Sequence, residues 1–60
     1  MPNDVLSVLG ARLKAARKER DLTQERLAEL SGRSARHIAK IEKGEVNPSF
    51  EALSTLVKAL

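Results

Sequence analysis

The chain has 60 residues, enough for one domain, and its eleven basic and eight acidic residues give a formal net charge of +3 at pH 7. It has no cysteine, which excludes disulfides and thiolate metal sites, and only one histidine, so we expect no metal and no cofactor. Helix-favouring residues dominate and β-branched residues are few, which predicts an all-α fold around a small aliphatic core.

The composition also bears on location and partners. No apolar run approaches the roughly 20 residues that span a bilayer. The N-terminal stretch "MPNDVLSVLG" carries an acid where a secretory signal carries basic residues. We therefore expect a cytoplasmic protein, and the excess of positive charge is compatible with an anionic partner.

The first predicted helix begins near Val5, with Asn3 or Asp4 as its N-cap, and ends near Arg20. Gly10 lies inside this helix, where glycine costs about 1 kcal/mol relative to alanine. It either permits close packing of a neighbour or is neutral. Apolar residues recur at steps of three and four, the spacing of one helical face, in the series Val5, Leu9, Leu13 and Ala16.

The second and third predicted helices are short. Thr23 is a suitable N-cap for the second, and Gly32 supplies the left-handed position that ends it. Ser34 caps the third, which runs over residues 35–43 and is closed by Gly44. The apolar face of the second helix comprises Leu27, Ala28 and Leu30.

The fourth predicted helix starts near Ser49, after a loop in which Pro48 pushes Asn47 away from helical geometry. Its apolar face comprises Phe50, Leu53, Leu56, Val57 and Leu60. The pattern is unbroken where the sequence stops, so we expect residues 1–60 to form a single domain that is complete only with residues beyond Leu60.

The third helix has two distinct sides. At about 100° per residue, Ile38 and Ile41 define the buried side, and Glu42 falls near its edge. The opposite side holds three cations, no acid and small residues, namely Arg36, Ala39, Lys40 and Lys43, with Ala35 on the flank. A solvated charged face is the simplest interpretation, but solubility is usually served by mixed charges. Small alanines also let a helix approach a surface closely.

The major groove of B-form DNA admits a helix of this kind. Arginine can donate two hydrogen bonds to guanine, lysine can reach guanine or a phosphate, and an alanine methyl can contact thymine. The hydroxyl of Ser34 can cap the helix or reach a base. This side of the helix therefore predicts binding to DNA.

The stretch "LTQERLAELSGRSARHIAKIEKGEVNPSFEAL" resembles the lambda-repressor-like (Cro/XRE-type) helix-turn-helix family. The resemblance rests on "LTQ", "LA", a turn glycine, "I..IE.G" and the proline before the next helix, at the family's spacing, and it extends from about Leu9 to Leu60. It implies a compact bundle of four or five helices whose third helix enters the major groove. It also implies sequence-specific binding of double-stranded DNA by a transcriptional regulator. Because a single small domain contacts too few base pairs for useful specificity, we expect a homodimer on a palindromic operator.

The resemblance assigns roles to individual residues. The base-reading positions are Ser34, Ala35, Arg36 and Lys40. The phosphate-contacting positions are Gln24, His37 and Lys43, and Arg33, which departs from the family pattern, is a further candidate for a phosphate contact. The structural pair is Arg17 and Glu42, for which a structural ion pair is favoured over an additional role in orienting backbone contacts.

Several alternatives stay open at this stage. Gln24 can be an ordinary helix-start residue, and His37 can be a partly packed surface residue. Arg33 replaces the apolar residue usual after the turn glycine, so it either loosens packing or adds a phosphate contact. A protein-interaction or antitoxin-type module with the same fold is the alternative function, and a large apolar patch on the first or fourth helix would favour it. No nucleophile and base are arranged for catalysis, so we do not expect an enzyme.

Overall fold

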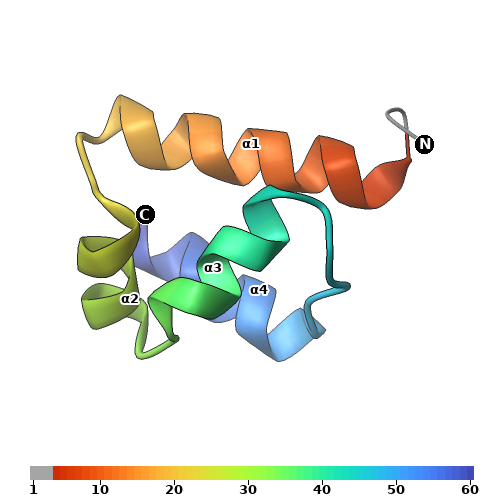
Figure 1. Ribbon diagram of the computed structural model, residues 1–60. Helices are drawn as coiled ribbons and strands as arrows, with labels where there is room; N and C mark the ends of the chain where they lie inside the picture. The colour runs from red at the N-terminus through yellow and green to blue at the C-terminus, as the bar shows by residue number, and fades with distance from the viewer. Residues whose placement is uncertain (1–3) are drawn as a thin grey trace.

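The structure, a computed structural model, describes residues 4–60, in which four helices and no strands occur. The helices are α1 (Val5–Glu19), α2 (Gln24–Ser31), α3 (Ala35–Glu42) and α4 (Phe50–Ala59). α1 lies across α3, and α2 packs on both α3 and α4 (Figure 1). The predicted all-α fold is therefore confirmed, and α3 ends one residue earlier than expected.

Each helix begins at a residue whose side-chain oxygen accepts a hydrogen bond from the backbone N–H three residues later. The caps are Asp4 at 2.7 Å, Thr23 at 2.9 Å, Ser34 at 3.0 Å and Ser49 at 3.0 Å. Such a cap contributes typically about 1 kcal/mol. Of the two cap candidates for α1, Asp4 takes the position, and Asn3 lies outside the described residues.

The core is aliphatic and draws on every helix. Leu13, Leu27, Ile38, Ile41 and Leu56 form one buried cluster, and all but Leu13 are at most 1% exposed. With so few buried side chains, each one carries a large share of the hydrophobic stabilisation.

Four residues that the helical patterns placed on apolar faces lie at the surface instead: Val5, Leu30, Phe50 and Val57 are 78%, 48%, 86% and 60% exposed. An apolar stripe is wider than the part of a helix that touches its neighbours. On α4, which packs on α2, the buried line runs through Ala52 and Leu56. The predicted face of α4 was therefore wrong at Phe50 and Val57, because the small residue Ala52 faces the core.

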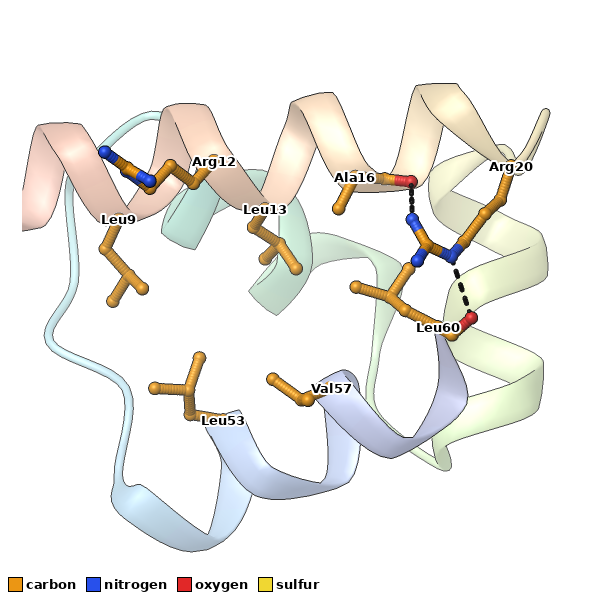
Figure 2. Close-up of a pocket in the computed structure, with 8 residues that line it drawn as sticks. All are labelled: Leu9, Arg12, Leu13, Ala16, Arg20, Leu53, Val57 and Leu60. Carbon is orange, nitrogen blue, oxygen red and sulfur yellow. Dashed lines mark hydrogen bonds between the residues drawn. The ribbon is translucent and has the colours of Figure 1, made fainter.

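An apolar groove of about 330 Å³ runs between α1 and α4. Leucine side chains from both helices point into it, and Arg20 lies at one end, where its Nε donates to the Leu60 carbonyl at 2.9 Å (Figure 2). None of the helices in residues 4–60 is both long and apolar enough to span a bilayer.

Gly10 is the point of closest approach between α1 and the end of α3. A Cβ built on Gly10 would lie 2.7 Å from the Glu42 carbonyl oxygen and closer still to that of Ile41. Both contacts are to backbone, which cannot move aside without shifting a helix. Of the two readings open for this glycine, close packing is the one that the structure supports.

We predict that Gly10→Ala destabilises the domain although alanine favours helix. The overpacking cost of about 1–3 kcal/mol exceeds or cancels the gain of about 1 kcal/mol in helix propensity. Thermal unfolding followed by circular dichroism measures the change. The matched control is Ala11→Gly at the exposed neighbouring position, which loses only propensity. A rise in melting temperature for Gly10→Ala would contradict the close approach.

Candidate nucleic-acid interface

The turn between α2 and α3 is a short, hydrogen-bonded connection. Gly32 adopts a left-handed conformation, with φ at 75°, and its N–H donates to the Ala28 carbonyl. The buried Ser31 hydroxyl accepts from the Arg33 N–H at 3.2 Å. Ser34 then caps α3. These local bonds cap the end of α2 and the start of α3.

The outward face of α3 carries the cations. Ile38 and Ile41 point into the core, while Arg36 and Lys43 are exposed and Lys40 is half-buried. Within residues 4–60, none of the three cations forms a side-chain hydrogen bond or ion pair. Ala39 lies between Arg36 and Lys40 in the chain, and Ala35 directly precedes Arg36. We call these five residues, Ala35, Arg36, Ala39, Lys40 and Lys43, the cationic face.

The cationic face has no acid because the one carboxylate of α3 is buried. The Glu42 side chain is 3% exposed and points toward α1 and α2. Its Oε2 lies 2.7 Å from Arg17 Nε, and its Oε1 lies 3.1 Å from Arg17 Nη2. Arg17 Nη1 also donates to the Leu22 carbonyl at 2.7 Å. This bidentate ion pair joins α1, the loop before α2 and the end of α3.

Gln24 completes the cluster. Its Nε2 donates to Glu42 Oε1 at 3.0 Å. An amide nitrogen carries two hydrogens, so one donor remains for another acceptor. The structure thus brings Gln24, one of the predicted phosphate contacts, into the Arg17–Glu42 pair. The sequence could not predict the hydrogen bond from Arg17 to the Leu22 carbonyl, because any residue supplies a backbone carbonyl.

The other predicted site residues, Ser34, His37 and Arg33, differ in exposure and in their hydrogen bonds. Ser34 is exposed at the start of α3, and its hydroxyl already accepts from the His37 N–H. His37 is half-buried in the first turn. Arg33 is half-buried, and its Nη2 donates to Thr55 Oγ1 in α4 at 3.4 Å. Arg33 therefore links the turn to α4, whereas the cations of α3 have no such tether.

The surroundings of the ion pair set its protonation state. Burial alone raises the pKa of Glu42, but the hydrogen bonds from Arg17 and Gln24 outweigh it and leave that pKa below its usual value. The hydrogen bond with Glu42 likewise raises the pKa of Arg17. Both groups are therefore charged at neutral pH.

Comparison with known proteins finds similar chains among regulators. A helix-turn-helix family model matches residues 13–60. The chain is 46% identical over 52 residues to the immunity repressor protein of Bacillus phage phi105, an alignment that covers 87% of this chain and 36% of the repressor. It is 35% identical over 57 residues to the control protein C.SmaI of Serratia marcescens, covering 95% of this chain and 68% of that protein.

A third similar protein is an uncharacterized HTH-type transcriptional regulator, y4dJ, of Sinorhizobium fredii. It is 33% identical over 57 residues, covering 95% of this chain and 74% of that protein. The chain thus spans little more than a third of the length of the phage repressor and about two thirds or more of the other two.

We predict that Arg17→Ala costs about 3–5 kcal/mol, because it leaves the Glu42 carboxylate buried without its cation. A 60-residue domain has a total stability of roughly 3–9 kcal/mol, so this cost is about a third or more of the total. Chemical denaturation followed by circular dichroism gives the value. Arg12→Ala, at an exposed position of the same helix, is the control and stays near wild type. An unchanged melting temperature for Arg17→Ala would show that the pair does not stabilise the fold.

We also predict a pH dependence that Glu42→Gln removes. Because the pKa of Glu42 is lower in the folded state, its contribution is fully present above the unfolded pKa of about 4.3 and is lost as pH falls through the folded pKa. Wild type is therefore more stable than Glu42→Gln at pH 7, and the two curves converge in acid.

The difference between these two curves isolates Glu42. The backbone hydrogen bond from Ser7 lowers the pKa of Asp4, and this adds the same acid slope to both proteins. Glu45→Gln, at an exposed position, serves as the control for the loss of one negative charge. Parallel curves for wild type and Glu42→Gln from pH 7 to pH 3 would refute the assignment.

Proposed function

The chain belongs to the helix-turn-helix family, and from this premise we propose that it binds double-stranded DNA sequence-specifically, as the DNA-binding domain of a transcriptional regulator. The observation that carries the proposal is the cationic face of α3, where three cations that form no ion pair among residues 4–60 lie beside two alanines. Such a face meets the two needs of a helix in the major groove, which are charge to attract phosphates and small side chains that allow close approach.

Each residue has a proposed role that follows from its position. Arg36, Ala35 and Ser34 lie at the start of α3, the part of a recognition helix that reaches base edges, and Lys40 follows one turn later. Lys43, at the end of α3, is proposed to approach the DNA backbone.

Three further residues are proposed to contact phosphates. Gln24 has one amide hydrogen free, and Glu42 holds its side chain in place. His37 lies in the first turn of α3. Arg33 would reach a phosphate only through donors that its contact with Thr55 leaves unused, since a guanidinium has five.

On DNA we propose a homodimer on two half-sites of a palindromic operator, separated by about 34–36 Å, one turn of the duplex. One helix of eight residues contacts few base pairs, and two copies double the sequence that is read. Because its target is the genome of the cell, we propose a cytoplasmic location.

Selection of bound sequences from a random duplex library tests the proposal directly. We expect enrichment of a short motif and its inverted repeat at low salt, with affinity falling linearly on logarithmic axes as salt rises. A triple variant, Arg36→Ala, Lys40→Ala and Lys43→Ala, keeps the core intact and serves as the matched control. If no sequence is enriched by the folded wild-type domain, sequence-specific binding is excluded.

We predict that Arg36 and Lys43 contribute differently to binding. Arg36→Ala costs about 1–3 kcal/mol on the best site and relaxes preference at one base position, because its planar guanidinium suits guanine. Lys43→Ala weakens all sequences alike and reduces the salt slope by about one, because it removes one phosphate contact. Titration of both variants against the best site and a single-base variant, at several salt concentrations, separates the two roles. Reversed behaviour would mean that α3 lies in the groove in another orientation.

A further inference from the structure

The outward face of α4 carries exposed apolar side chains that the DNA-binding role does not use. Phe50, the only aromatic residue of the chain, is 86% exposed, and Val57 is 60% exposed. Together with Leu53, Ser54 and Lys58 they line a shallow depression of about 340 Å³. A contiguous exposed apolar surface of this kind marks an interaction site more often than isolated exposed residues do.

The apolar pair and the charged pair on this face have the same spacing along α4. Phe50 and Val57 are seven residues apart, and so are Glu51 and Lys58. At about 100° per residue, each pair lies within about 20° on the helix, and Ser54 lies between the two pairs. Ser54 is about 180° from the middle of the buried line through Ala52 and Leu56, so it marks the centre of the outward face.

The charges of this face are unused within the domain. Neither Glu51 nor Lys58 forms an ion pair among residues 4–60. Their spacing along the helix, about 10 Å, is too long for them to pair with each other. One end of the face therefore presents an apolar residue beside an acid, and the other end presents an apolar residue beside a base.

This order is complementary to itself when the helix direction is reversed. A two-fold axis that runs between two copies of α4 at the level of Ser54, perpendicular to both helices, sets the copies antiparallel and keeps each side of the face on the same side. Phe50 then meets the partner's Val57, and Glu51 meets the partner's Lys58, and the symmetry repeats both contacts. The small Ser54 side chain lets the two helices approach closely at the axis.

We propose that the outward face of α4 is the surface on which a second copy of this chain packs antiparallel, about a two-fold axis at Ser54. The inference deepens the homodimer of the proposed function. The self-matching charges favour a second copy over a different partner, because an acidic or a basic partner would repel one end of the face. The surface formed by Phe50, Glu51, Ser54, Val57 and Lys58 is smaller than the roughly 800 Å² that each partner buries in a stable complex. The dimer is therefore weak in free solution and is strengthened when two copies bind adjacent DNA half-sites.

A single introduced cysteine tests the axis. The chain has no cysteine, so Ser54→Cys provides one thiol per molecule. Helices packed at about 8 Å place facing Cα atoms roughly 3–5 Å apart, near the range that a disulfide bridges. We expect mild oxidation to yield a covalent dimer at low protein concentration on DNA of two half-sites, and at high protein concentration without DNA. Ala11→Cys, on an exposed position of α1, is the matched control and yields at least tenfold less.

Charge exchange tests the pairing. Glu51→Lys and Lys58→Glu each place like charges opposite one another in a homodimer, and we expect each to weaken self-association about tenfold in sedimentation equilibrium. An equimolar mixture of the two variants restores opposite charges in both pairs and recovers association, as does the double variant. Circular dichroism melting verifies that each variant is folded, since both substitutions oppose the helix dipole.

The outcomes separate this inference from the proposed function. Single variants that bind one half-site normally but lose cooperative binding to two half-sites support the α4 interface. If all charge variants sediment alike and Ser54→Cys crosslinks no better than Ala11→Cys, the α4 interface is overturned, whatever the DNA result. If the wild-type protein does not bind a single half-site, the DNA-binding proposal is overturned. The sedimentation result then decides the interface by itself.

Discussion

The buried Glu42 carboxylate is the constraint on which the rest of this small domain depends. It is the last residue of α3, and it accepts hydrogen bonds from Arg17 of α1 and Gln24 of α2. One anion therefore joins three helices in a domain whose hydrophobic core has few side chains. It also leaves the exposed side of α3 without negative charge, so the same burial that organises the fold determines the sign of the surface proposed to bind DNA.

Close backbone contact reinforces this organisation. Gly10 lets α1 rest on the carbonyl groups at the end of α3, beside the ion pair. The C-terminal end of α3 is thus fixed by packing and charge together, while its N-terminal end depends on local hydrogen bonds of the turn, from Gly32 to Ser34. The residues proposed to read bases lie at the N-terminal end of α3, where a change of side chain disturbs few tertiary contacts.

The sequence predicted local features well and the orientation of helices less well. The caps Thr23 and Ser34 were found because their hydrogen bonds involve residues three apart in the chain. The surface positions of Phe50 and Val57 were missed because the pattern of α4 alone does not say which part of its apolar stripe meets α2. The same limit applies to Arg33, whose contact with Thr55 joins residues far apart in sequence. The residues proposed to contact DNA could be selected by family resemblance, and their bonding within the domain required the fold.

The length of α3 has a consequence for how binding and folding are linked. With eight residues, it is shorter than the roughly 12–15 residues at which a helix becomes marginally stable in water by itself. The arrangement of its side chains therefore exists only while the whole domain is folded. Any DNA that binds this arrangement draws the folding equilibrium toward the native state by mass action. Under the proposed function, occupancy of a DNA site would then depend on the folded fraction of the domain as well as on its concentration.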